Sequence, residues 1–195
     1  MRIEREHVLF RRGRAGTDTN QALREIRKGI AAVVWPPRAR DFSIRPIRKG
    51  NGVTPIKQAC MKYLERMGWR VEQSLSLAQG ASPGPIDAVK PLRNGKLFAL
   101  EWETGNISSS HRALNKMLVG LKEGLLAGGA LILPTRAFYK FLTDRVGNYE
   151  ELAPYFPVWN RPDVSGTLIV IAIEFDRLRN DVPRIRKGTD GRALV

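Results

Sequence analysis

The sequence predicts a single α/β domain in which a central mixed β-sheet is flanked by helices on both sides. The expected elements occur in the order helix, helix, three strands, helix, strand, helices, strand, and this mixture is typical of one mixed sheet. The run T-L-I-V-I-A-I-E-F at 167–175 is apolar nearly throughout, which is typical of a strand buried on both faces. The 195 residues suit one domain spanning 1–195.

Two helices and a strand are predicted in the first part of the chain. Residues 20–34 and 54–67 carry apolar side chains at helical spacing. The second of these segments begins with Thr-Pro, a favourable helix start, and Gly68 ends it. The basic, turn-rich stretch 38–52 between them is expected to be a loop. Residues 69–75 alternate in polarity and predict the first strand.

A β-hairpin is predicted over residues 84–103. Two apolar runs, 86–89 and 96–103, flank a turn that contains Asn94-Gly95. Asn-Gly between apolar runs is a strong hairpin signal, because both residues tolerate the positive φ angles of the tight turn. The sequence therefore predicts three consecutive antiparallel strands.

Acidic side chains gather at the end of this hairpin. Side chains alternate along a strand, so Glu101 and Glu103 share one face, and Asp87 lies across the hairpin from them. Like charges at this distance repel, and burying them is unfavourable. A divalent cation would relieve both problems, and carboxylates suit Mg²⁺. The alternative is a solvated strand end with surface acids.

Helices and short strands fill the rest of the chain. Residues 108–127 predict a helix that Gly128-Gly129 ends, and 130–133 a short apolar strand. Thr135 is expected to cap the next helix, and a further short helix is expected at 150–155. The tail after the last strand is basic and is expected to be a loop.

The composition favours a polyanionic partner. The chain has 33 Lys and Arg against 19 Asp and Glu, a net charge of +14, which favours nucleic acid, with acidic membrane surfaces as an alternative. No apolar run is long enough to span a membrane. The single Cys60 excludes an intramolecular disulfide, is expected in the core, and fits a cytoplasmic protein.

The acidic hairpin resembles the motif of metal-dependent nucleases written PD…(D/E)xK. The matching residues are Pro85, Asp87, Glu101 and Glu103, the last in place of the usual Lys. This departure, followed by T-G-N-I-S-S at 104–109 and by His111-Arg112, closely resembles the BamHI-like type II restriction endonucleases. The resemblance runs from about residue 51 to 191, and the length suits a compact member of that group.

The resemblance implies a restriction-endonuclease-like fold and a magnesium site. It assigns Asp87 and Glu101 as Mg²⁺ ligands, Glu103 to the attacking water, and a fourth active-site carboxylate to Glu72 through the pattern W-x-x-E. From alternation alone, Glu72 faces either this site or water. Glu65, on the preceding helix, is the alternative candidate for the fourth carboxylate. Glu103 either accepts a proton from water or only orients it.

Base-reading residues are also implied by the resemblance. Residues of this kind offer hydrogen bonds to base edges in the major groove, with Arg suited to guanine, Asn to adenine and Asp to cytosine. The implied set is Asn106, Ser108, Arg112, Asp144, Arg145, Asp190 and Gly191. From the residues alone, each is equally a cap, a surface ion pair or a turn. The implied target is the palindrome GGATCC, cut after the first G to leave 5′ extensions.

Three functions remain open on the sequence. The first is a homodimeric type II restriction endonuclease, because a palindromic duplex needs two cuts related by a two-fold axis. The helix at 109–127, with Gly120 and Gly124 on one face, is the candidate interface. The others are a DNA-binding protein without catalysis, whose acids are structural, and a structure-specific nuclease of the same fold.

Overall fold

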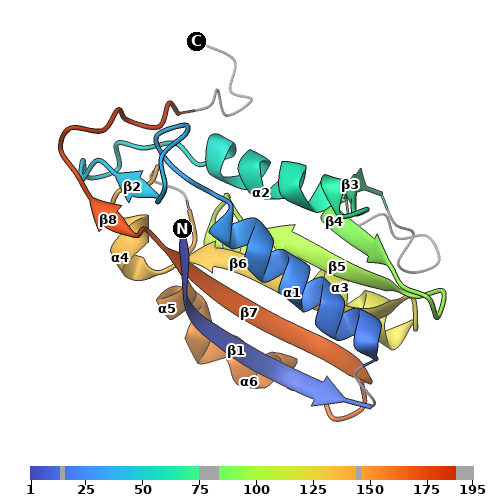
Figure 1. Cartoon of the computed structure of the whole chain (residues 1–195). Helices are drawn as coiled ribbons and strands as arrows, with labels where there is room; N and C mark the ends of the chain where they lie inside the picture. The colour runs from blue at the N-terminus through green and yellow to red at the C-terminus, as the bar shows by residue number, and fades with distance from the viewer. Residues whose placement is uncertain (14–15, 75–83, 144–145, 188–195) are drawn as a thin grey trace.

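A six-stranded mixed sheet forms the centre of the molecule (Figure 1). The computed structural model describes residues 1–13, 16–74, 84–143 and 146–187. The strands, in spatial order, are β1 (Arg2–Arg12), β7 (Gly166–Glu174), β6 (Leu126–Pro134), β5 (Leu97–Trp102), β4 (Ile86–Pro91) and β3 (Arg70–Gln73). The central strands β7, β6 and β5 run parallel, and the outer pairs are antiparallel. The predicted mixed sheet is therefore confirmed.

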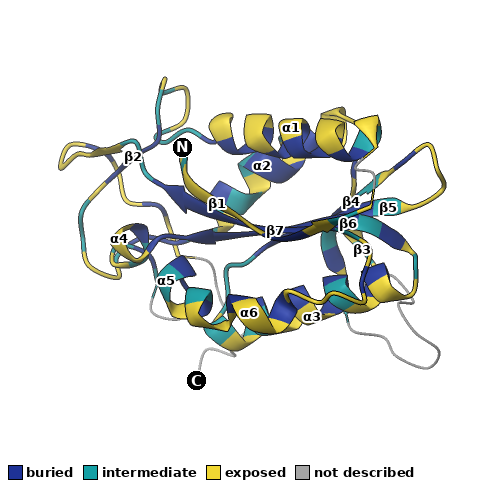
Figure 2. Ribbon diagram, turned by 90° about the horizontal axis from the view of Figure 1, so that it is seen from below, coloured by how far each residue is buried: buried dark blue, intermediate teal, exposed yellow. Residues whose placement is uncertain are grey.

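Helices cover both faces of this sheet, as predicted (Figure 2). One face carries α1 (Thr17–Ala31) and α2 (Thr54–Arg66), which contact each other. The other carries α3 (Ile107–Lys122) and a chain of short helices, namely α5 (Tyr149–Leu152), η1 (Ala153–Tyr155) and α6 (Phe156–Trp159). A small parallel sheet of β2 (Ser43–Ile44) and β8 (Arg177–Leu178), together with α4 (Arg136–Tyr139), completes the fold.

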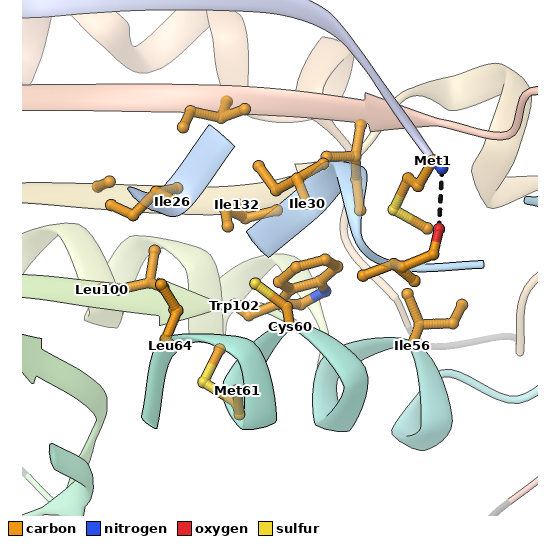
Figure 3. Close-up of a cluster of buried hydrophobic side chains, with 14 of the residues drawn as sticks. Met1, Ile26, Ile30, Ile56, Cys60, Met61, Leu64, Leu100, Trp102 and Ile132 are labelled. Carbon is orange, nitrogen blue, oxygen red and sulfur yellow. Dashed lines mark hydrogen bonds between the residues drawn. The ribbon is translucent and has the colours of Figure 1, made fainter. Parts of the chain in front are cut away.

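The layer between α1, α2 and the sheet is a continuous apolar core (Figure 3). Cys60 is fully buried there, between α2 and the sheet, and burial raises the pKa of its thiol to about 12. A thiol in this state is not a nucleophile, which agrees with the predicted core position. The ammonium group of Met1 donates to the carbonyl oxygen of Val33 over 2.8 Å at the edge of this core.

The predicted hairpin is present and places alternate side chains in different cores. Gly95 has a φ of 79° in the turn between β4 and β5, a conformation that glycine adopts without strain. Phe98 and Trp102 pack in the core beneath α1 and α2, whereas Ala99 packs beneath α3. The apolar residues of β5 fill these two cores, and the acidic side chains follow at its carboxyl end.

Strand β1 was not predicted from the sequence. Its residues from Arg2 to Val8 are mostly exposed, while Leu9 and Phe10 are buried. The register against β7 shifts twice, between Ile3 and Arg5 and between Val8 and Phe10. Each shift moves later side chains to the opposite face, so the period-two pattern that marks a strand is lost. The short strands β2 and β8 likewise lie inside segments predicted as loops.

The predicted end of the third helix was wrong. Helix α3 ends at Lys122, and Gly124, with a φ of 74°, lies in the turn that follows. Gly128 and Gly129 lie inside β6 instead. A side chain at Gly128 would lie 2.4 Å from the ring of Phe98, so glycine is needed there for close packing. The helix expected at 150–155 is instead the succession of α5, η1 and α6.

Candidate active site

Three acidic residues lie in one row across neighbouring strands. The register pairs Ala88 with Val71 of β3 and with Leu100 of β5, so continuing it by one residue places Asp87 between Glu72 and Glu101. Side chains that face each other across antiparallel strands point to the same face. The sheet therefore brings together two of the sequence-predicted carboxylates, Asp87 and Glu101, and places Glu72 next to them in the row.

Asp87 and Glu101 are in direct contact through the backbone. The main-chain N–H of Asp87 donates to Glu101 Oε2 over 3.4 Å, and the main-chain N–H of Trp102 donates to Asp87 Oδ2 over 2.7 Å. Glu101 is buried, with 6 % of its surface exposed. Two carboxylates held this closely by backbone donors create a local centre of negative charge.

Two lysines neutralise this centre from opposite sides. Lys57 of α2 lies with Nζ 2.5 Å from Asp87 Oδ1. Lys116 of α3 forms an ion pair with Glu101 Oε1 and donates to the carbonyl oxygen of Pro85 over 2.9 Å. Sequence reasoning missed both lysines. Their signal is weak, because each is one of many basic residues and only the packing of α2 and α3 against the sheet brings it to the acids.

The acidic pair lies in a cleft of about 370 Å³ between the carboxyl end of β5 and the start of α3. The main-chain N–H groups in the first turn of α3 and the dipole of this helix favour an anion at this end. The lining side chains combine acids and bases: Lys57, Asp87, Glu101, Glu103, Arg112 and Lys116. A phosphate group bridged to the acids by a cation fits this arrangement of charges.

The two glutamates of the motif have perturbed acidities. Burial raises the pKa of Glu101, and the negative charge of Asp87 raises it further, against the opposing effect of Lys116. Burial also raises the pKa of Glu103, and Asp87 again contributes, against the opposing hydrogen bond from the N–H of Gly105. Both ionised carboxylates are therefore destabilised in the metal-free fold, and a bound cation would relieve this.

This destabilisation predicts that Glu103→Gln raises the melting temperature of the metal-free protein near pH 7. A carboxyl whose folded pKa is raised contributes stability below its unfolded pKa and loses it as the pH rises through the folded pKa. The gain should therefore vanish at about pH 4. Melting curves in EDTA at both pH values test this, with the exposed Glu123→Gln as the charge-matched control. An equal gain at both pH values would contradict the expectation.

Glu103 and Glu72 lie outside the acidic pair. Glu103 Oε1 accepts a hydrogen bond from Gly105 N over 2.6 Å and faces the same cleft. Glu72 is exposed, has a φ of 51°, and lines a neighbouring cavity together with Lys57 and Asp87. Its left-handed backbone is unfavourable for a residue other than glycine, a kind of strain often found at functional sites. The rival Glu65 is exposed on α2 and lines none of these cavities.

The donor set at the pair fits a hard divalent cation. Glu101 Oε1 is buried and, despite its ion pair with Lys116, accepts no well-aligned hydrogen bond. Over the described ranges, no three His, Cys, Asp or Glu side chains converge tightly enough to enclose a metal ion. Mg²⁺ usually takes one or two carboxylates and completes its shell with water and phosphate oxygens. Asp87 and Glu101 supply that pair.

Three of the predicted base-reading residues lie beside the cleft. Asn106 is the N-cap of α3, and its Oδ1 accepts from the main-chain N–H of Ser109 over 3.1 Å. Ser108 and Arg112 are exposed on the first turns of the same helix, and Arg112 lines the cleft. The remaining candidates lie outside the described residues: Asp144, Arg145, Asp190 and Gly191.

Asn51 ties together the chain segments that lead to those four residues. Its side-chain amide donates to the carbonyl oxygens of Arg45 and Phe141, each over 3.0 Å, and its Oδ1 accepts from the N–H of Ile185 over 3.1 Å. Asn51 is fully buried, and its bond from Ile185 is buried, whereas its bonds to Arg45 and Phe141 are partly buried. Residues 141 and 185 are thereby held at the start of α2, close in the chain to Lys57.

His111 packs against aromatic side chains. Its ring lies 4.8 Å from that of Tyr155 and 5.2 Å from that of Trp159, measured between centroids. These contacts join α3 to η1 and α6.

Among the described residues, no helix is long and apolar enough to cross a membrane.

Comparison by sequence finds a matching family model and two relatives. The family model for restriction endonuclease BamHI matches residues 1–192. The chain is 49 % identical to the type II restriction enzyme OkrAI of Oceanobacter kriegii over 195 residues, which covers 100 % of both chains. It is 38 % identical to the type II restriction enzyme BamHI of Bacillus amyloliquefaciens over 178 residues, 88 % of this chain and 82 % of that enzyme.

A solved structure shows the same fold. The crystal structure of restriction endonuclease BglII complexed with a DNA 16-mer superposes with a TM-score of 0.64 at 10 % identity, over 90 % of this chain and 79 % of that chain. The two relatives identified by sequence are named as type II restriction enzymes, which are site-specific deoxyribonucleases. The family match spans nearly the whole chain and includes the acidic cleft and its flanking helices. The chain therefore belongs to the BamHI family of type II restriction endonucleases.

Proposed function

We propose that this endonuclease hydrolyses phosphodiester bonds of a palindromic duplex DNA site in a reaction that requires Mg²⁺. The observation that carries the proposal is the contact between Asp87 and Glu101 at the end of a cleft lined by basic side chains. A buried carboxylate pair beside a positively charged surface suits a cation and a phosphate together. A DNA-binding protein would not need this pair.

The residues of the cleft divide the chemistry among them. Asp87 and Glu101 would hold Mg²⁺, with Glu72 assisting from the neighbouring cavity. When bound, the cation supplies charge stabilisation at the phosphate and a more acidic water. Glu103, with its raised pKa, accepts the proton of the attacking water. Its bond from Gly105 fixes one carboxylate oxygen at the wall of the cleft.

The proposed target is GGATCC, cut after the first G on each strand to leave 5′ extensions. The family resemblance supports this, because every base-reading residue that it implies is present in the sequence, from Asn106 to Asp190 and Gly191. The set includes two Asp acceptors suited to cytosine and two Arg donors suited to guanine, which favours a site containing G·C pairs. Asn106, Ser108 and Arg112 stand beside the cleft, where a base edge near the cutting site would be read.

Digestion of supercoiled plasmid with Mg²⁺, and with EDTA as the control, tests this function against its alternatives. Discrete fragments that appear only with Mg²⁺ are the expected result. Specific binding without any cutting would instead identify a DNA-binding protein. Cutting of branched DNA alone would identify a structure-specific nuclease of the same fold.

The enzyme is proposed to act as a homodimer, through a surface other than the face expected to carry Gly120 and Gly124. Gly120 is buried within the monomer, and Gly124 lies outside α3. The outer side of α3 and the short helices after α5 instead expose Val119, Tyr155 and Val158, at 39 %, 49 % and 66 %. Exposed large apolar side chains on helices that pack on the same face of the sheet suit a surface that a second copy covers.

Val158→Glu is expected to convert the dimer to a monomer at micromolar concentration, because the new carboxylate would be buried without a partner in the interface. Sedimentation of both proteins measures this directly, and the variant should nick plasmid more than it linearises it. Val8→Glu, on the exposed part of β1 at 46 % exposure, is the matched control and should remain dimeric. A dimeric Val158→Glu variant would remove this surface from the interface.

A further inference from the structure

Lys57 reaches the acidic cleft from a helix that otherwise belongs to the core. The buried residues of α2 are Ile56, Cys60, Met61 and Leu64, which pack towards the sheet. Lys57 lies on the first turn and contacts Asp87 Oδ1 with its Nζ at 2.5 Å. It lines both the cleft and the neighbouring cavity beside Glu72. The packing of α2 does not require a charged side chain at this place.

The two lysines of the cleft differ in their freedom to move. The side chain of Lys116 is 9 % exposed and is fixed between Glu101 and the carbonyl oxygen of Pro85. The side chain of Lys57 is 28 % exposed, and it opens onto both cavities. Lys116 therefore holds the β4 and β5 ends together, whereas Lys57 can exchange one anionic partner for another within the cleft.

The charge balance of the cleft calls for such an exchange. The nuclease motif ends in a lysine, and Glu103 stands at that position here, so the strand end carries a negative charge in place of a positive one. A cation bound to Asp87 would compete with the ammonium of Lys57 for Oδ1, because two positive charges repel at this distance. A phosphate entering the cleft offers that ammonium a new anionic partner.

We propose that Lys57 is a catalytic residue of DNA cleavage, which leaves Asp87 when a divalent cation binds there and donates a hydrogen bond to a non-bridging oxygen of the scissile phosphate. This role rests on the Mg²⁺-dependent function proposed above. The oxygen of water forms a bond to phosphorus, its proton passes to Glu103, and the bond from phosphorus to the leaving oxygen breaks. The leaving oxygen takes its proton from solvent, and Lys57 stays protonated and stabilises the charge on the phosphate.

Lys57→Met should therefore change metal binding and cleavage in opposite directions. Calorimetric titration of the DNA-free protein with MgCl₂ should show binding tighter by roughly tenfold, because the competing ammonium is gone. Single-turnover cleavage of a GGATCC duplex at saturating Mg²⁺ should fall by about 10²- to 10³-fold, the usual effect of removing one group that stabilises transition-state charge. Lys57→Arg should recover part of the cleavage rate, since it keeps the charge.

Lys62→Met is the matched control, since Lys62 is exposed on the same helix and lines neither cavity. It should leave both measurements unchanged, and melting curves of all variants establish that each is folded. A Lys57→Met variant that cleaves at the wild-type rate would overturn the proposal. So would slower cleavage with unchanged or weaker Mg²⁺ binding, because the lysine would then not compete with the cation. A wild-type protein that fails to cut with Mg²⁺ would contradict the proposed function itself.

Discussion

Asp87→Asn and Glu101→Gln are each expected to abolish DNA cleavage while specific DNA binding survives. Each change removes one charge from the carboxylate pair that would hold the cation. The amide side chain has a similar shape and keeps an oxygen that can accept the same main-chain hydrogen bond. The loss should reach on the order of a thousandfold or more, because it removes the cation as well as the carboxylate. Cleavage assays and gel-shift measurements on the same duplex separate the two effects.

Asp18→Asn is the control for these variants. Asp18 is a carboxylate paired with Arg93 near the β4–β5 turn, at the opposite end of the hairpin from the acidic pair. Its loss removes the same charge and one surface ion pair, which contributes little to stability. The control should cut DNA as the wild type does. Wild-type cleavage by Asp87→Asn or Glu101→Gln would remove that residue from the active site.

Arg145→Ala is expected to lose discrimination between sites as well as affinity. An arginine that forms two hydrogen bonds with guanine contributes about 1–3 kcal/mol of discrimination, or roughly ten- to a hundredfold. Competition binding of the GGATCC duplex against duplexes with one altered outer pair measures this ratio. The assignment comes from the resemblance, since Arg145 lies outside the described residues.

Arg136→Ala is the control that distinguishes a loss of base recognition from a general loss of positive charge. Arg136 is an exposed arginine at the start of α4 and has no assigned base contact. Its loss should weaken binding to all duplexes alike, if at all, because a charge near DNA contributes without regard to sequence. If Arg145→Ala also leaves the ratio of cognate to altered duplexes unchanged, its assigned role fails.

The parts of the fold that the sequence predicted are those in which local pattern and tertiary packing agree. Thr167 to Phe175 was recognised as a buried strand because both of its faces are apolar, and the hairpin because Asn94-Gly95 can form its turn. Strand β1 was missed because two bulges interrupt its alternation. The end of α3 was placed wrongly because Gly128 and Gly129 were taken as a helix end. They are glycines because Phe98 and Met117 pack closely against them.

The candidate site was predictable in part for the same reason. Asp87, Glu101 and Glu103 lie on one hairpin, so the period of two brings them together before any tertiary contact is known. Lys57 and Lys116 come from the helices before and after the hairpin, and only the packing of α2 and α3 against the sheet brings them to the acids. A sequence contains no local signal for such an encounter between a helix and a strand end.

The termini of cleaved DNA test the central claim most directly. A plasmid with a single GGATCC site, digested with Mg²⁺ and sequenced at both ends, should show each strand cut between the two guanines, with 5′-GATC extensions. The same plasmid with that site changed to AGATCT should remain intact. Cutting at AGATCT, or at every GATC regardless of its flanks, would contradict the proposed reading of the outer pairs. No cutting of either plasmid would contradict the assignment of the acidic cleft as an active site for duplex DNA.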